Sequence, residues 1–199
     1  MDIKIILGVL AAVIGTLAFF PYIRDTLTKK TKPHSFTWLI WALTQGTAVV
    51  ALWVGGGGVG AIALTIGTFL VFCVFLLSLK YGTKDITRSD KMVLIVALLA
   101  IVVWWQLDNP VLAVIMVSAI DVLGFIPSFR KSFKDPWSET TWSWIMYATA
   151  NILAIFALRE YNALTVTYIS SIAVAEIFLL VIVYFRRPVI SSKLTNHRL

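Results

Sequence analysis

Residues 38–45 read WLIWALTQ, and residues 144–151 read WIMYATAN. Each stretch starts with Trp, continues through two aliphatic residues to an aromatic residue and Ala, and ends on a carboxamide side chain. The two stretches lie 106 positions apart in the chain. Their similarity predicts two copies of one structural unit.

The 106-residue shift aligns more than these two stretches. It places Pro21 opposite Pro127, and it continues without a gap as far as Lys80 opposite Arg186. Apolar stretches, basic loops, prolines and amides all coincide in this one frame. We therefore expect the beginning of the chain to be repeated at its end.

The chain is far more apolar than a soluble domain, which is about half apolar and about a quarter charged. Of its 199 residues, 59% are hydrophobic and 14% are charged, and its mean hydropathy is +0.89. A bilayer core needs about 20 apolar residues per helix. This composition predicts an all-α, multi-pass protein of the plasma membrane, or of the cell inner membrane in a bacterium. The expected spans are about 4–23, 36–54, 59–79, 91–106 (marginal in length), 109–129, 141–158 and 163–185.

Basic residues are distributed unevenly over the expected loops. Of the 17 Lys and Arg residues, 15 fall on one side of the predicted membrane, leaving Lys4 and Arg159 on the other. Basic loops mark the cytoplasmic side, so we expect an N-out, C-in chain. The net charge of +7 is then a topology signal. It predicts contact with the lipid bilayer and no nucleic-acid partner.

Spans one to three are expected to recur as spans five to seven, with span four between them. Three spans form an odd unit, so one extra crossing is needed to give both copies the same orientation. The predicted architecture is therefore 3+1+3 with parallel repeats. Its parts are a first three-helix bundle at 1–82, a linker helix at 83–108, a second bundle at 109–188 and a cytoplasmic tail at 189–199.

Two longer stretches carry a resemblance to a known family. FFPYIRDTLTKKTKPHSFTWLIWAL (19–43) and GFIPSFRKSFKDPWSETTWSWIMYA (124–148) each have a proline late in one helix, a basic loop, and a serine or threonine with aromatics opening the next. This pattern resembles the PQ-loop of the SWEET and PQ-loop (MtN3-like) transporter superfamily. The chain has Pro-Tyr and Pro-Ser where that family has Pro-Gln.

The resemblance implies two three-helix bundles that rock about a central solute pocket by alternating access. Pro21 and Pro127 would be the hinges, because proline removes a helical hydrogen bond and lets a helix bend. The alternative is that both prolines simply end helices at the membrane edge.

Two ionisable side chains, Asp121 and Glu176, lie far from either face of the predicted membrane. A carboxylate at that depth costs several kcal/mol unless it is paired, solvated or protonated. We expect both acids to couple transport to protons. The alternatives are a structural hydrogen bond from protonated Asp121, and a position for Glu176 among the lipid headgroups.

Helical periodicity places Trp41 and Gln45 on one stripe of the second span, and Tyr147 and Asn151 on the matching stripe of the sixth. Amides beside flat aromatic rings could bind a small polar solute, so we expect these four residues to form a substrate pocket. Close packing of the two helices is the alternative interpretation.

Trp38 and Trp144 begin the same stripes near the cytoplasmic edge, where they are expected to form either a gate or an interfacial aromatic belt. Thr68, Tyr168 and Ser171 add hydroxyl groups to the third and seventh spans. We predict that these hydroxyls join the substrate pocket, although each alone could equally be a packing residue.

The predicted function is a secondary transporter for a small polar solute, with proton coupling as one option and a homo-oligomer left open. A SWEET-type sugar uniporter is an alternative, although Ile66 and Ile172 align with the asparagines that grip sugar in that family. A receptor on the same fold, similar to the KDEL receptor, is another. Neither His34 nor His197 falls in a span, and Cys73 is the only cysteine, so we expect no enzyme, metal site or cofactor.

Overall fold

The structure is a computed structural model that describes residues 3–54, 58–104, 106, 110–158 and 161–196. Within these residues it contains seven α-helices and no β-strand. This confirms the predicted all-helical fold. The helices are α1 (Ile3–Leu27), α2 (Ser35–Val54), α3 (Gly58–Tyr81), α4 (Arg88–Trp104), α5 (Pro110–Lys134), α6 (Thr141–Ala157) and α7 (Ala163–Asn196).

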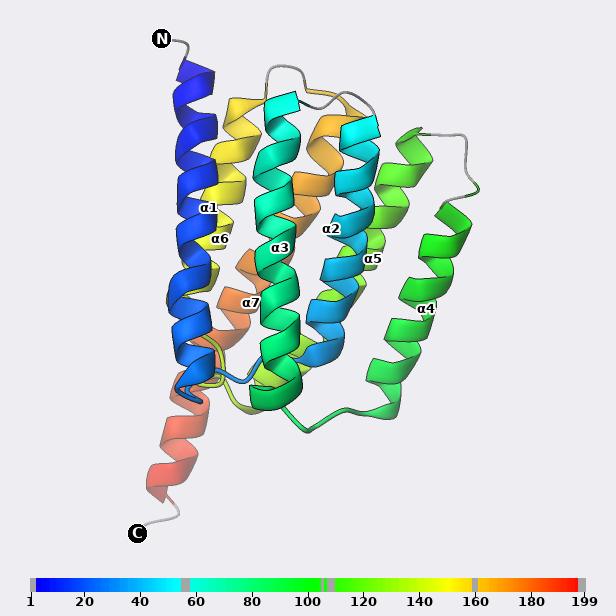
Figure 1. Ribbon diagram of the computed structural model, residues 1–199. Helices are drawn as coiled ribbons and strands as arrows, with labels where there is room; N and C mark the ends of the chain where they lie inside the picture. The colour runs from blue at the N-terminus through cyan, green and yellow to red at the C-terminus, as the bar shows by residue number, and fades with distance from the viewer. Residues whose placement is uncertain (1–2, 55–57, 105, 107–109, 159–160, 197–199) are drawn as a thin grey trace.

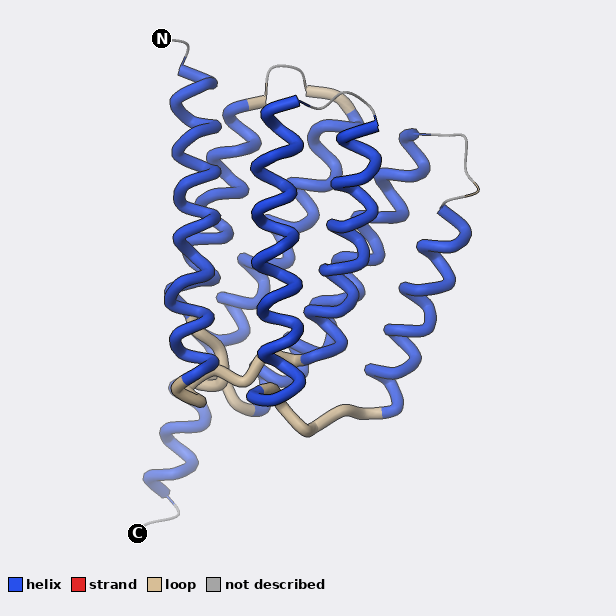
Figure 2. Tube along the Cα trace, in the orientation of Figure 1, coloured by secondary structure: helices blue, strands red, loops and turns tan. Residues whose placement is uncertain are grey.

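Successive helices run in opposite directions along one bundle (Figure 1). The connections after α1, α3 and α5 therefore meet at one end, where α7 also leaves the bundle toward the C-terminus. We call this the basic end, because residues 24–34, 80–91, 130–140 and 186–187 there hold most of the lysines and arginines. The N-terminus lies at the opposite end, and the described connections are short (Figure 2).

Six of the helices form a closed ring. Around the ring the contacts run from α1 to α3, α2, α5, α7 and α6, and from α6 back to α1. Helix α4 packs outside this ring against α5 and α2, at the right of Figure 1. The first three helices and the last three thus occupy two adjoining arcs, and α1 and α5 run in the same direction.

The outer faces of the helices are apolar. On α1, Val9, Val13, Leu17 and Phe20 are each about half exposed or more, spaced at three or four residues as one helical stripe requires. Exposed Ile, Leu, Val and Phe side chains continue over α3, α4 and α7. Two segments, Ile3–Leu27 and Thr165–Ser191, are long and apolar enough to cross a membrane by length and composition.

Polar side chains are instead buried in the bundle. Thr26, Thr37, Thr44 and Ser132 are at most 1% exposed. Soluble proteins seldom expose large continuous apolar surfaces, and they seldom bury polar groups without need. The bundle thus buries polar side chains among its apolar core and has an apolar exterior.

Pro21 and Pro127 both lie inside helices. Helix α1 continues past Pro21 to Leu27, and α5 continues past Pro127 to Lys134. The alternative that these prolines end their helices is therefore wrong. Apolar length alone could not predict the extra turns, because these turns leave the apolar stretch and are held by contacts among the basic loops.

A glycine sets the spacing between the two halves of the ring where α2 meets α5. A Cβ atom on Gly124 would lie 3.0 Å from Nε1 of Trp41 and 3.2 Å from Cγ2 of Ile40. Only glycine allows so close an approach without a shift of the facing side chains. The contact brings Trp41 of the first half directly against α5.

Candidate functional site

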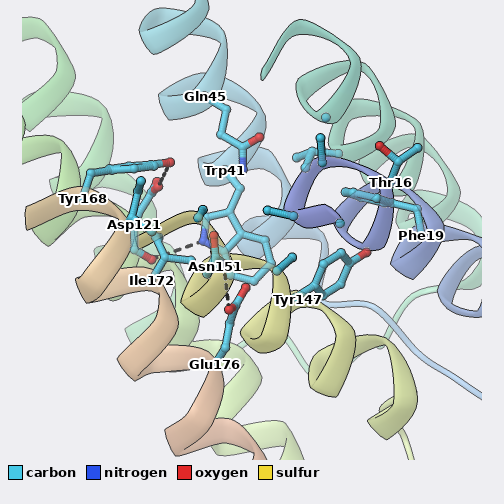
Figure 3. Close-up of a pocket in the computed structure, with 18 of the residues that line it drawn as sticks. Thr16, Phe19, Trp41, Gln45, Asp121, Tyr147, Asn151, Tyr168, Ile172 and Glu176 are labelled. Atoms are coloured by element: carbon cyan, nitrogen blue, oxygen red, sulfur yellow. Dashed lines mark hydrogen bonds between the residues drawn. The ribbon is translucent and has the colours of Figure 1, made fainter. Parts of the chain in front are cut away.

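A cavity of about 590 Å³ lies in the centre of the ring (Figure 3). All six ring helices contribute to its lining, and no described residue of α4 does. The lining reaches Gly8 and Leu158 toward the N-terminal end of the bundle. Toward the basic end its last residues are Trp38 and Trp144, one turn into α2 and α6.

Asp121 lies on the wall of this cavity and is fully buried. The Tyr168 hydroxyl donates a hydrogen bond of 2.6 Å to Oδ2 of Asp121, and the Thr44 hydroxyl donates one to Oδ1. Nε1 of Trp41 donates to the backbone carbonyl of Asp121 at 3.2 Å. The carboxyl thus accepts hydrogen bonds from α2 and α7 and holds both helices against α5 (Figure 3).

Glu176 is the second acid of the cavity wall, and it is 5% exposed. Nδ2 of Asn151 donates a hydrogen bond of 2.8 Å to its Oε2 (Figure 3). Burial inside the ring favours a cavity position for Glu176 over the alternative position among lipid headgroups. One of the two predicted amides is therefore the direct partner of one of the two predicted acids.

Most of the predicted pocket residues come together. Trp41, Gln45, Tyr147, Asn151 and Tyr168 all line the cavity with the two acids. The lining also includes Thr16, Phe19 and Phe125, which sequence reasoning missed because no motif distinguishes them from other residues of their helices.

Thr68 and Ser171 do not line the cavity, so their prediction as pocket residues is not supported. Ser171 Oγ donates to the backbone carbonyl of Thr167, at 2.6 Å, within its own helix. Thr68 Oγ1 is buried without a hydrogen-bond partner. A serine hydroxyl can bond to the preceding helical turn, so its presence in a span does not show which way it points.

Trp38 and Trp144 are each 2% exposed, so the interfacial-belt interpretation is wrong for both. They belong to an aromatic layer at the basic end of the cavity. In this layer the ring centroid of Trp41 lies 5.2 Å from that of Trp38, 6.0 Å from that of Trp144 and 4.5 Å from that of Phe125. Tyr22 packs beneath it, 5.0 Å from Trp38.

A buried ion pair lies beyond the aromatic layer. Nζ of Lys131 is 2.5 Å from Oε1 of Glu139, and both side chains are more than nine-tenths buried. Oε2 of Glu139 accepts a hydrogen bond from Nε1 of Trp144 at 3.0 Å and one from the Tyr22 hydroxyl at 3.3 Å. Lys131 also donates to the backbone carbonyl of Lys32, which connects the end of α5 to the loop after α1.

A second polar cluster joins α4 to the ring. Arg130 lies 2.5 Å from Oδ2 of Asp90 and 3.0 Å from Oδ2 of Asp85. Nε2 of the fully buried His34 lies 3.4 Å from Oδ2 of Asp90. Burial lowers the pKa of His34 from its ordinary 6.5 to about 4, although Asp90 opposes this effect. Lys131 and Arg130 lower the pKa further.

Sequence reasoning missed both polar clusters. The sequence predicts that the basic residues are topology signals and bilayer contacts, whereas Lys131 pairs with Glu139 of the loop that follows α5, and Arg130 pairs with Asp90 of α4. Charges at helix ends and in loops follow no repeating pattern, so only the folded chain shows which of them meet. Within the described residues, no group of three or more His, Cys, Asp or Glu side chains could hold a metal ion.

The fold and the site define a class of protein: a seven-helix α-protein with an apolar exterior and a central cavity that contains two buried carboxyl groups. Comparison with protein-family models, with curated proteins and with solved structures finds no match.

Proposed function

We propose that this chain is a multi-pass membrane transporter that moves a small polar solute by alternating access. The observation that carries the proposal is the central cavity, which extends toward one end of the bundle and stops at the aromatic layer near the other. A carrier needs a central binding site that is closed toward one side of the membrane at a time.

The apolar exterior supports a membrane location. Seven spans of alternating direction would place the basic end in the cytoplasm by the positive-inside rule, with the N-terminus outside. Two of the helices meet the length and composition of a span by themselves. Buried polar side chains fit this location, since side chains that face away from lipid can form hydrogen bonds with each other or with a solute.

The arrangement of the ring supports a rocking movement of its two halves. The arcs α1–α3–α2 and α5–α7–α6 meet where α2 contacts α5 and where α6 contacts α1. At the basic end the halves are joined by Lys131 to Lys32 and by Tyr22 to Glu139. Opening that end would require these contacts to break, with Pro21 and Pro127 as bending points inside α1 and α5.

Proton coupling through Asp121 and Glu176 is part of the proposal. Both acids lie in the cavity wall without a basic side chain beside them in the described lining. A buried carboxyl group can keep its proton while the site is closed and release it when the site opens to water or when a bound cation takes the proton's place. The PQ-loop resemblance of the loops after α1 and α5 supports the same mechanism by analogy.

A sugar uniporter is less favoured than a transporter of another solute. Sugar binding needs many hydrogen bonds, yet the cavity lining is mostly aromatic and aliphatic. Ile172 lines the cavity, and Ile66 is 47% exposed. A receptor on this fold would bind its ligand without net flux, and the transport assay separates the two.

The test is solute flux into proteoliposomes under an imposed pH gradient. We expect saturable uptake whose rate falls at least about tenfold in Asp121→Asn or Glu176→Gln, which corresponds to a transport barrier higher by about 1.4 kcal/mol. Asp85→Asn is the matched control, because it makes the same change at a carboxyl that is 55% exposed and outside the cavity. Uptake no faster than in protein-free liposomes for sugars, amino acids and amines alike would contradict the proposal.

A further inference from the structure

The cavity wall carries ionisable groups of one kind. Asp121 and Glu176 are its two acids, and the described lining contains no lysine, arginine or histidine. The buried Lys131 lies beyond the aromatic layer and is held by Glu139. The protein therefore supplies no cation of its own to the two acids from within the described cavity wall.

The polar neighbours of the acids present them as hydrogen-bond acceptors. Tyr168 donates to Asp121 and Asn151 donates to Glu176. Donors of this kind stabilise a negative carboxylate, but they do not neutralise its charge. A buried carboxylate needs a cation or a proton to offset the cost of leaving water. A positively charged ligand can thus supply the cation that the described cavity wall lacks.

The rest of the wall suits an organic cation better than a metal ion. Trp41, Tyr147, Trp38 and Trp144 contribute aromatic side chains to the lining, and aromatic faces attract ammonium groups. A volume of about 590 Å³ is typical of small-molecule sites and far exceeds a bare ion. A metal ion would also need several ligands, and the described residues contain no group of three or more His, Cys, Asp or Glu side chains that could hold one.

We infer that the cavity binds an organic cation, an amine or ammonium compound whose charged head lies at Asp121 and Glu176 and whose apolar body packs on Trp41 and Tyr147. The inference rests on the proposed transport function and specifies its substrate class. Amino acids fit less well, because their carboxylate would face the two acids and meet no basic side chain of the described lining.

Three ligands of similar shape test the charge requirement. Phenethylamine is a cation at neutral pH, 2-phenylethanol is its neutral counterpart, and phenylalanine is the zwitterion. Their binding to the detergent-solubilised protein can be followed by tryptophan fluorescence and by thermal shift. We expect phenethylamine to bind at least about tenfold more tightly than either of the others, since one ion pair in a partly buried site is worth more than about 1.4 kcal/mol.

Variants locate the binding site. Asp121→Asn and Glu176→Gln keep the size of the side chain, and we expect at least one of them to weaken phenethylamine binding about tenfold or more. Asp85→Asn should leave it unchanged, because Asp85 is exposed at the basic end. If neither cavity variant folds, the three-ligand comparison on the unmodified protein decides the question without them.

The outcomes separate this inference from the proposed function. Equal binding of all three ligands, or amine binding that both cavity variants leave unchanged, overturns the inference. Flux of a neutral solute without amine binding also overturns it and leaves transport standing. Selective amine binding without flux supports the cation site and contradicts the transporter.

Discussion

His34 is fully buried at the basic end, where its neutral form is favoured. Its pKa falls from 6.5 to about 4 on folding, mainly because burial removes water from the ring. The unfolded chain therefore binds a proton between pH 6.5 and 4 that the folded chain does not. The contribution of His34 to stability is complete above pH 6.5 and is lost as the pH falls toward 4.

We expect the contribution of His34 to the free energy of unfolding, taken as the difference between the unmodified protein and His34→Asn, to fall by up to about 3 kcal/mol between pH 7 and pH 4, since each pKa unit is worth about 1.4 kcal/mol. Thermal unfolding in detergent across this range measures it. His34→Asn should flatten the curve, because asparagine does not titrate. Asp85 has a lowered pKa through Lys134 and Arg130, but it titrates below its ordinary 3.8, outside this window. An equally steep curve in His34→Asn would refute the assignment.

Gly82 lies directly after α3, where the chain passes close to the loop before α2. A Cβ atom there would lie 2.2 Å from the carbonyl oxygen of Ser78 and 2.5 Å from that of Pro33. Both are backbone atoms, which cannot move aside as a side chain could. We expect Gly82→Ala to destabilise the protein by about 1–3 kcal/mol, the usual cost of overpacking, measured as a lower Tm.

Gly46→Ala is the matched control for that substitution. Gly46 lies in α2, and a Cβ atom there would meet nothing within 4 Å. Alanine is the better helix former by about 1 kcal/mol, so Gly46→Ala should be neutral or stabilising. A similar drop in Tm for both variants would mean that the crowding at Gly82 is not the cause.

At the scale of the helices, the Lys131–Glu139 pair joins the end of α5 to the start of α6 beneath the aromatic layer. Removing one partner leaves the other charge buried and unpaired, which typically costs about 3–5 kcal/mol. We expect Glu139→Gln to lower the free energy of unfolding by an amount in this range. The exposed pair of Lys134 and Asp85 is the control, since Lys134→Met should cost about 1 kcal/mol or less.

The double variant Lys131→Met, Glu139→Gln distinguishes a buried ion pair from a general packing effect, because Gln keeps an acceptor for Trp144 and Tyr22. Removing both charges leaves neither buried and unpaired, so the double variant should be more stable than Glu139→Gln alone. Chemical unfolding in detergent gives the values. If the two single losses simply add in the double variant, the side chains do not act as a pair.

Sequence predicted the helices well because apolar runs of span length are a strong local signal. It also placed Trp41, Gln45, Tyr147 and Asn151 on cavity-facing stripes, since helical periodicity sets which residues share a face. Contacts at the basic end, between loops and helix ends, were not predictable in this way. Glu139 meets Tyr22 across 117 positions, and no local pattern links the two. The direction of Thr68 was not predictable either, because one hydroxyl group in an apolar helix forms no repeating pattern.

At the scale of the whole molecule, the repeat in the sequence, the ring of six helices and the central cavity are related. The two copies of the WLIWALTQ pattern bring Gln45 and Asn151 into the same cavity from α2 and α6. The acids of the described lining come only from α5 and α7, so the ring encloses a chemically one-sided site. The central claim is that this site opens in turn to each end of the bundle.

Accessibility of one cysteine from each side of a membrane tests that claim most directly. Thr16→Cys places a thiol on the cavity wall once Cys73, the free cysteine, is replaced by alanine. Lys30→Cys, exposed at the basic end, reports vesicle orientation. With a membrane-impermeant thiol reagent, the account predicts that Thr16→Cys reacts from the N-terminal side and also, while solute is being exchanged, from the basic side. Reaction from one side only, with and without transported solute, would contradict it.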